Sequence, residues 1–454
     1  MTERVVVVGG DAAGMSAASQ AKRMKGDALE VIALERGSHV SYSACGIPYW
    51  IGGAVGSVDA LVARTPEEHR ANGIDLRMRS EATAIDLDRR VVEVRDHEDG
   101  RTYEEGFDQL VLATGARPRR PDVPGVDADG IFGVQTLDDG ELVLDALAGD
   151  PRRAVVVGGG YIGIEMAEAM VNRGLEVTVA TRSAEPMATL DPDMGRLVHA
   201  AMERMGIDVR TGVALESFET GEDGAVRAVH TSAGKLPADL VVLGTGVGPE
   251  TSLAAAAGLP LGRWGGLVTD LQMRVFDADG VWAAGDCVES IDRVSGNRVH
   301  VALGTHANKQ GRVLGTNLGG GYATFPGVVG TAMSKVCDLE IARTGLLEAD
   351  CDAVGYQRLT VTVESTTRAG YFPGAAEITV KLVVERRTGR LLGGQIVGKE
   401  DAAKRIDTLA VALWNGMTVE EISALDLGYA PPFSPVWDPV LIAARKAADL
   451  VRAG

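Results

Sequence analysis

The sequence has neither an excess of positive charge nor a long hydrophobic run. Its formal net charge is -18 at pH 7, so we expect no nucleic acid or anionic membrane partner, because either would require a basic face. No stretch reaches the roughly 18 consecutive apolar residues of a transmembrane helix. The N-terminus runs directly into the apolar stretch Val5–Val8, without the order of regions that marks a signal peptide. We therefore expect a cytoplasmic protein.

Cysteine is scarce, and its spacing excludes two kinds of site. The four cysteines, Cys45, Cys287, Cys337 and Cys351, form no CxxC or CxxxxC pair and no metal-ligand pattern with the seven histidines. We expect no metal, and no structural disulfide framework in a reducing compartment.

Aromatic residues make up only 4% of the 454 residues, whereas glycine occurs 58 times. Abundant glycine indicates many tight turns and close backbone approaches. At roughly 150 residues per domain, the length predicts about three domains. Such a chain can bury a large cofactor.

Two segments repeat one pattern: a short β-branched run, a glycine turn and a helix of small residues. They cover Val5–Ala18 and Ala154–Met170, and each is typical of the βα unit that opens a Rossmann fold. The buried strand Leu29–Glu35 ends in an acid about 20 residues beyond the first glycines, where a ribose hydroxyl is expected.

Further strands surround the second repeat. Leu110–Gly115 precedes it, and the proline-rich stretch Arg117–Pro124 is interpreted as a linker. Asp239–Gly246 and Gly280–Asp286 follow it, so the second repeat is predicted to lie inside the first. From about Phe325 the pattern becomes that of a third, α+β domain, with strands at 358–363 and 377–384 and a helix at 402–415.

The two glycine loops differ in one position. The second, Gly158–Gly163, is a complete GxGxxG between a strand and a helix, which predicts a dinucleotide site. The first, Gly9–Gly14, has Asp11 in place of the middle glycine. A carboxylate facing phosphate is unfavourable, so Asp11 either turns away or caps the following helix. A plain βα turn remains the alternative for this loop, although Glu35 supports the nucleotide site.

With these motifs, almost the whole chain resembles the pyridine nucleotide-disulfide oxidoreductases. Gly280–Asp286 resembles their second FAD motif, in which the aspartate binds the ribityl chain, and Ala113–Gly115 resembles their central motif. The resemblance implies two nested Rossmann-like domains and a C-terminal α+β dimerisation domain. The implied boundaries are 1–117 with 246–324 for FAD, 118–245 for NAD(P)H and 325–454 for the homodimer contact.

The segment around Cys45 selects a branch of this family. Members with two redox cysteines carry CxxxxC, but Trp50 takes the second position, and no histidine follows His306 to form their His-Glu pair. Ser41–Tyr49 resembles the single-cysteine branch, which contains coenzyme A-disulfide reductases, NADH oxidases and peroxidases. Oxidases and peroxidases usually carry a catalytic histidine where this chain has Ala12, which argues against peroxide chemistry.

The resemblance also implies catalytic and substrate residues. Tyr371 and Tyr429 match two tyrosines that coenzyme A-disulfide reductases direct toward the partner subunit's cysteine. The matching substrate contacts are Ser16, Gln20, Arg23 and Ser41, which can hydrogen-bond or neutralise phosphate. Two positions depart from the coenzyme A pattern: Ala44 replaces an asparagine and Trp437 replaces a lysine. The physiological disulfide therefore stays open.

For the two cofactors the resemblance and the loops together imply many contacts. Thr181 ends the strand at 176–181 where an NAD-selective site places an acid, and Arg182 follows, which favours NADPH while leaving NADH possible. The full set of expected cofactor contacts is Gly9, Gly10, Ala13, Gly14, Glu35, Arg36, Ser43, Thr114, Gly115, Gly158, Gly160, Tyr161, Ile162, Gly163, Glu165, Thr181, Arg182, Gly246, Gly285 and Asp286.

These features predict an FAD-dependent NAD(P)H:disulfide oxidoreductase in which Cys45 alternates between thiolate and mixed disulfide. A free thiol has a pKa of about 8.5, so we expect the flavin and a helix N-terminus to favour the thiolate. Alternatives are an NAD(P)H oxidase or persulfide reductase using the same cysteine. An electron-transfer flavoprotein that leaves Cys45 idle, or a redox sensor, would belong to another class.

Overall fold

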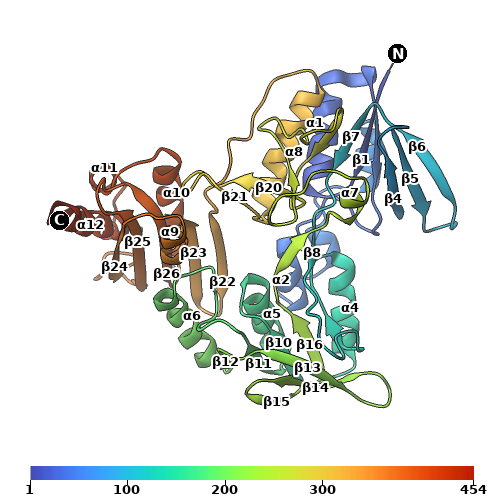
Figure 1. Ribbon diagram of the computed structural model, residues 1–454. Coiled ribbons are helices and arrows are strands. Elements are labelled where there is room, and N and C mark those ends of the chain that lie inside the picture. The colour runs from blue at the N-terminus through green and yellow to red at the C-terminus, as the bar shows by residue number, and fades with distance from the viewer. Residues whose placement is uncertain (1, 454) are drawn as a thin grey trace.

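The structure, a computed structural model, describes residues 2–453. Figure 1 shows three lobes, two built around parallel sheets and one around an antiparallel sheet. The predicted α/β fold with a C-terminal α+β part is confirmed. None of the helices within residues 2–453 has the length and apolar character needed to cross a membrane.

The first lobe contains a five-stranded parallel sheet. Its strand order is β19 (Val281–Ala283), β7 (Gln109–Leu112), β1 (Glu3–Val8), β2 (Leu29–Leu34) and β3 (Ile74–Arg77). The valines of β1 are buried because helices cover one face of this sheet and the small antiparallel sheet of residues 80–106 packs on the other. On one face α1 (Ala12–Lys25) packs on α8 (Gly304–Leu318), where Gly311 and Gly315 allow the helices to approach closely.

The second lobe repeats this arrangement. Its parallel strands are β12 (Asp208–Arg210), β11 (Glu176–Ala180), β10 (Arg153–Val157), β16 (Leu240–Leu243) and β9 (Ile131–Phe132). The helices of this part are α4 (Leu137–Ala148), α5 (Tyr161–Asn172) and α6 (Pro192–Arg204). In the sequence this sheet lies between β7 and β19, so it interrupts the first sheet as expected, while the exact domain boundaries stay a prediction.

Small sheets and short helices complete the two lobes. They are β4 (Ser80–Asp86), β5 (Val91–Asp96), β6 (Thr102–Gly106), β13 (Leu215–Thr220), β14 (Val226–Thr231), β15 (Gly234–Pro237), β18 (Leu267–Val268), β20 (Val288–Ile291), β21 (Arg298–Val299), α2 (Ile47–Ile51), α3 (Pro66–Ala71) and α7 (Ser252–Ala256). The stretch interpreted as a linker is partly a strand. Its start lies in β8 (Ala116–Pro118), which pairs antiparallel with β17 (Val247–Pro249).

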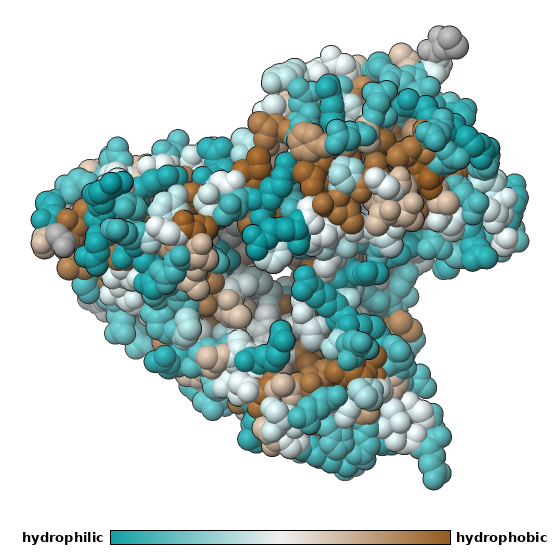
Figure 2. Space-filling view, in the orientation of Figure 1, coloured by the Kyte–Doolittle hydropathy of each residue, from teal (hydrophilic) through white to brown (hydrophobic). Residues whose placement is uncertain are grey.

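The third lobe is an antiparallel sheet packed against helices. Its strand order is β22 (Ala332–Val336), β23 (Leu339–Gly345), β26 (Leu391–Gly398), β25 (Glu377–Glu385) and β24 (Arg358–Thr366). The helices are α9 (Glu348–Ala353), α10 (Ile406–Trp414), α11 (Val419–Ser423) and α12 (Pro439–Ala453). Figure 2 shows a hollow where the three lobes meet.

Candidate active site

The first glycine loop passes close to two neighbouring backbone segments. Gly9 has a φ of +113°, and a Cβ there would overlap the carbonyl group of Ala113. A Cβ at Gly14 would overlap the carbonyl of Gly9. Helix α1 then begins at Ala12 with no side-chain cap on its first N–H groups. Uncapped amides at the positive end of a helix suit a diphosphate.

Two carboxyl groups flank this loop. Glu35, directly after β2, accepts hydrogen bonds from the N–H groups of Gly10 at 2.7 Å and Gly37 at 2.6 Å. Asp286 follows β19, and burial raises its pKa to about 6, against the opposing effect of His300. Acids after the C-terminal ends of these two strands, β2 and β19, fit the ribose and ribityl hydroxyls of FAD. Thr114 donates to the carbonyl of Glu250 at 2.5 Å.

Asp11 turns away from the helix it precedes. Its Oδ1 accepts the backbone N–H of Tyr42 at 3.1 Å, and its side chain makes no cap hydrogen bond. Of the two predicted alternatives, turning away is confirmed and capping is wrong. Burial raises the pKa of Asp11 to about 6.

Cys45 lies in a single 3₁₀ turn, Ala44–Gly46, next to the first glycine loop. The residue is exposed, and the preceding Ser41 donates its N–H to the Gly10 carbonyl at 3.1 Å. Partial burial of the sulfur, followed by the charges of Glu165 and Asp286, raises the pKa of the Cys45 thiol. The expectation that a helix N-terminus favours the thiolate is therefore not met by the chain alone, because these acids and the desolvation act in the opposite direction.

The second glycine loop has the backbone approach that the motif predicts. Gly158 has a φ of +112°, and a Cβ there would overlap the Gly244 carbonyl. A Cβ at Gly160 would meet nothing within 4 Å. Gly160 precedes α5, whose first turn has no side-chain cap. The open space beside free amides fits a second diphosphate.

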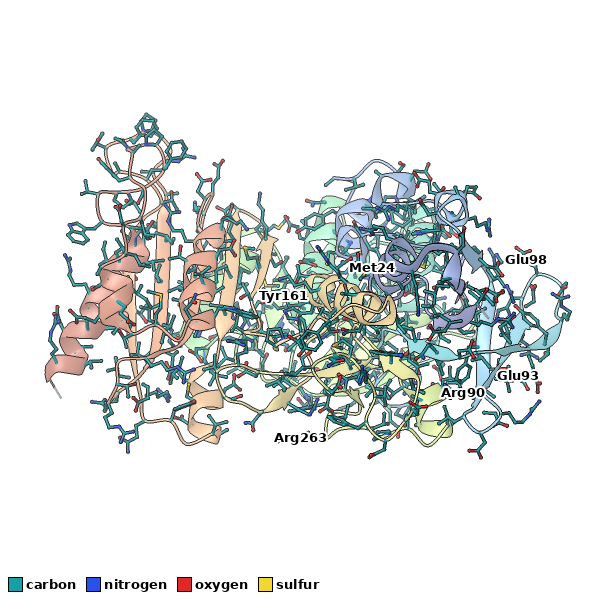
Figure 3. The ribbon with its side chains drawn as sticks, turned by 90° about the horizontal axis from the view of Figure 1, so that it is seen from above. Met24, Arg90, Glu93, Glu98, Tyr161 and Arg263 are labelled. Atoms are coloured by element: carbon teal, nitrogen blue, oxygen red, sulfur yellow. The ribbon has the colours of Figure 1, made fainter. Side chains whose placement is uncertain are left out.

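Helix α5 directs two side chains toward the centre of the molecule. Tyr161 lies there in Figure 3, and its buried hydroxyl faces that of Thr189 but makes no hydrogen bond of normal geometry within residues 2–453. Glu165, one turn later, accepts a hydrogen bond from Ser334 of β22 at 2.7 Å, and burial raises its pKa. Because Glu165 also acts on the Cys45 thiol, the helix after the second loop faces the cysteine that follows the first. A buried polar atom without a partner fits a bound ligand.

The residues expected to select the nicotinamide cofactor follow β11. Thr181 is buried, and its hydroxyl lies 2.9 Å from that of Ser183. Arg182 is exposed. No carboxylate occupies these three positions.

Three of the four predicted substrate residues hydrogen-bond to other side chains of the protein. On α1, Ser16 donates to Asn308 Oδ1 at 2.9 Å and Gln20 donates to Thr316 Oγ1 at 3.2 Å, so both face α8. Arg23, also on α1, is exposed. Ser41 has a φ of +48°, and its hydroxyl lies 2.9 Å from Nε2 of His69.

Tyr371 and Tyr429 come together on the third lobe. They are 78% and 48% exposed, and desolvation together with a hydrogen bond to Tyr371 raises the pKa of Tyr429. Within residues 2–453 neither tyrosine hydrogen-bonds to the Cys45 segment. Arg405, which the sequence did not single out, holds both tyrosine loops by donating to the carbonyls of Thr367 at 2.6 Å and Phe433 at 2.7 Å.

Two glycine loops, each followed by a helix whose first turn has no side-chain cap, lie near one exposed thiol, that of Cys45. This arrangement fits an oxidoreductase that binds two dinucleotides. The chain belongs to the pyridine nucleotide-disulphide oxidoreductase family, which matches residues 3–311, and its dimerisation domain matches residues 331–439. The predicted family and enzyme class, an NAD(P)H-dependent flavoprotein reductase, are confirmed. Membership implies FAD and NAD(P)H as cofactors.

Three similar proteins cover almost the whole chain. An NAD(P)H coenzyme A polysulfide/persulfide reductase of Pyrococcus horikoshii is 39% identical over 98% of both chains. Reduced CoADR-RHD of Bacillus anthracis is 32% identical, with a TM-score of 0.96 over 100% of this chain and 81% of that chain. An engineered water-forming NADPH oxidase, a variant of the Lactobacillus brevis enzyme LbNOX, is 29% identical, with a TM-score of 0.94 over 99% of both.

Proposed function

We propose that this enzyme reduces a low-molecular-weight disulfide with NADPH, and that Cys45 is its one redox cysteine. The main observation behind this proposal is the position of Cys45, which is exposed between the first glycine loop and Glu165 of α5. The other cysteines lie in different surroundings. Cys287 and Cys351 are buried, and the Cys337 sulfur contacts the Met205 sulfur at 3.0 Å. Trp50, at the second position of a CxxxxC pair, is only 8% exposed and part of a core.

The reaction converts one disulfide, NADPH and a proton into two thiols and NADP⁺. FAD, when bound, accepts hydride from NADPH and supplies two electrons to sulfur. The Cys45 thiolate attacks one sulfur of the substrate, so that a Cys45 mixed disulfide forms and the first thiolate leaves. Tyr429 of the partner subunit, with the partner's Tyr371 beside it, donates a hydrogen bond or proton to that leaving sulfur. Reduction of the mixed disulfide releases the second thiol.

For the cofactor sites we propose the roles predicted from the loops. The first loop, with Glu35, Thr114 and Asp286, would hold FAD. The second loop would hold the NADPH diphosphate, with Tyr161 and Glu165 at the nicotinamide. The open Cβ position at Gly160 and the unpaired hydroxyl of Tyr161 support the second assignment.

The preference for NADPH rests on Thr181, Arg182 and Ser183. A 2′-phosphate needs a cation and no nearby carboxylate. The engineered NADPH oxidase carries three consecutive substitutions: aspartate to alanine, alanine to arginine and methionine to serine. This chain has the same order of residue types, a small uncharged residue followed by arginine and serine.

The substrate class is a disulfide of coenzyme A or a related thiol. Ser16, Gln20, Arg23 and Ser41 would contact it, whereas Ala44 and Trp437 leave the exact thiol open. A second candidate is a persulfide, since a relative 39% identical is named as a coenzyme A polysulfide/persulfide reductase.

We further propose a homodimer in which the third lobe covers the partner's cysteine. An apolar surface supports this: besides both tyrosines, Phe433 is 74%, Val436 67% and Trp437 49% exposed. Large exposed apolar patches usually mark interfaces.

The four unpaired cysteines fit a reducing compartment, so we propose a cytoplasmic location.

Anaerobic turnover of NADPH with coenzyme A disulfide, cystine and a coenzyme A persulfide tests the proposal. Cys45→Ser should abolish turnover while FAD remains bound and reducible by NADPH, whereas the matched variant Cys337→Ser should keep the wild-type rate. Full turnover by Cys45→Ser would favour an electron-transfer flavoprotein. Oxygen consumption without any disulfide, at a rate that exceeds disulfide turnover, would favour an oxidase.

A further inference from the structure

Asp11 connects the first glycine loop to the segment that carries Cys45. Its Oδ1 accepts the Tyr42 N–H at 3.1 Å. Immediately beside this bond, Ser41 donates its N–H to the Gly10 carbonyl at 3.1 Å. Two neighbouring hydrogen bonds therefore hold residues 41–46, the cysteine segment, on the loop. One of them depends on a side chain at the position where the GxGxxG pattern has a glycine.

The groups that face Asp11 supply no positive charge. Glu35 comes from the end of β2, Asp286 from the end of β19, and Tyr42 and Cys45 from the cysteine segment. On α1 itself the first turn has no acidic residue and the basic residues lie in the last turn. Within residues 2–453 no cation forms an ion pair with Asp11. Only the helix N-terminus offers partial positive charge.

A bound FAD would add the negative charges of its diphosphate to this group of acids. Like charges disfavour an ionised carboxylate, as does burial. Burial, and then the charges of Glu35 and Asp286, already raise the pKa of Asp11 to about 6, against the lowering effect of the Tyr42 N–H. A neutral carboxyl group keeps one oxygen as the acceptor for Tyr42 and adds no negative charge beside the diphosphate.

We propose that FAD binding takes up one proton at Asp11, whose neutral carboxyl group keeps its contact with Tyr42 and so holds the cysteine segment on the loop. The inference rests on the assignment of the first loop to FAD. The direction of the pH dependence follows from the linkage between proton binding and FAD binding. Because the diphosphate raises the pKa of Asp11 above its value without FAD, FAD affinity is greatest below that value. It falls by up to about tenfold per pH unit as pH rises from the lower to the higher of the two pKa values, and is constant above the higher one.

Two variants isolate this proton. Asp11→Asn keeps an acceptor for the Tyr42 N–H but cannot ionise. Asp11→Gly restores the expected loop residue and removes both the acceptor for Tyr42 and the ionisable group. Purified holoenzymes are diluted at pH values from about 5.5 to 8.5, and free FAD is separated by ultrafiltration and measured by its fluorescence. Glu35 and Asp286 stay in all three proteins, so their contribution cancels.

We expect log Kd for FAD to rise with pH more steeply in the unmodified enzyme than in either variant. The difference in slope should reach about one unit of log Kd per pH unit, which corresponds to one proton. The infrared spectrum of the holoenzyme near neutral pH should show the carbonyl band of a protonated carboxylic acid that Asp11→Asn lacks. Parallel pH curves for the unmodified enzyme and both variants would overturn the inference and leave the proposed function intact. Failure of all three proteins to bind FAD would overturn the proposed function itself.

Discussion

Nε2 of His69 lies 2.9 Å from the hydroxyl of Ser41, four residues before the redox cysteine. His69 is only 1% exposed, and its Nδ1 has no partner within residues 2–453. Burial, followed by the charge of Arg64, lowers the pKa of His69, so the ring is neutral at pH 7. A neutral ring offers one donor and one acceptor, and it therefore fixes the direction of the Ser41 hydroxyl.

His69→Leu should raise the KM for the disulfide about fivefold, because the Ser41 hydroxyl loses the partner that orients it toward substrate; a buried hydrogen bond contributes about 1 kcal/mol. Steady-state kinetics on the holoenzyme measures this. In a Ser41→Ala background His69→Leu should have no further effect on KM. An equal effect in both backgrounds would show that His69 does not act through Ser41.

Tyr429→Phe should lower kcat roughly tenfold or more while KM changes little, because a hydrogen bond to the departing sulfur forms only as the S–S bond breaks. Stopped-flow and steady-state rates with the best disulfide check this. Tyr322, 77% exposed and outside the site, provides the control, and Tyr322→Phe should leave both constants unchanged. An increase in KM at constant kcat would assign Tyr429 to binding alone.

Thr181→Glu should reduce kcat/KM for NADPH by about tenfold or more, equivalent to ~1.4 kcal/mol, because a carboxylate beside Arg182 repels a 2′-phosphate. The value for NADH should change much less. Parallel assays with both cofactors measure the ratio. A clear preference of the unmodified enzyme for NADH would contradict the reasoning from Thr181 and Arg182.

The glycine loops could be predicted from sequence because their signal is local. Gly9 and Gly158 have the positive φ values and the close backbone contacts that the motif requires. Asp11 shows the limit of local reasoning. Capping the next helix and turning away are both open to an aspartate at that position, and only the distant Tyr42 N–H decides between them.

Contacts between distant segments could not be predicted. The pKa of Cys45 is raised partly by Glu165 and Asp286, which are more than a hundred residues away in the sequence. Arg405 lies in a stretch predicted only as helix, and nothing near it indicates that it holds both tyrosine loops. The proline-rich stretch at 117–124 was interpreted as a linker because the partner of its first residues, β17, follows only after the inserted lobe.

Lys381 of β25 is a further contact of this kind and joins the second lobe to the third. It is 2% exposed, and its Nζ lies 3.1 Å from Asp191, which precedes α6, and 2.6 Å from both Asp193 and Glu348. Burial alone would lower the pKa of Lys381, but hydrogen bonds to Asp193 and Glu348 outweigh it and raise the pKa. The stability that the charged lysine contributes is therefore complete at neutral pH and is lost only as pH rises through this raised pKa.

Lys381→Met should lower the free energy of unfolding by about 3 kcal/mol, because it leaves the buried Asp191 without its cation. Denaturant titration at pH 7 measures this loss. Lys404 pairs with Asp407 at 2.5 Å but is 78% exposed, so Lys404→Met should leave stability almost unchanged. Because the lost contact joins two lobes, unfolding of Lys381→Met should also separate into two transitions. An unchanged single transition at the wild-type midpoint would mean that the apolar contacts between the lobes suffice without the buried charges.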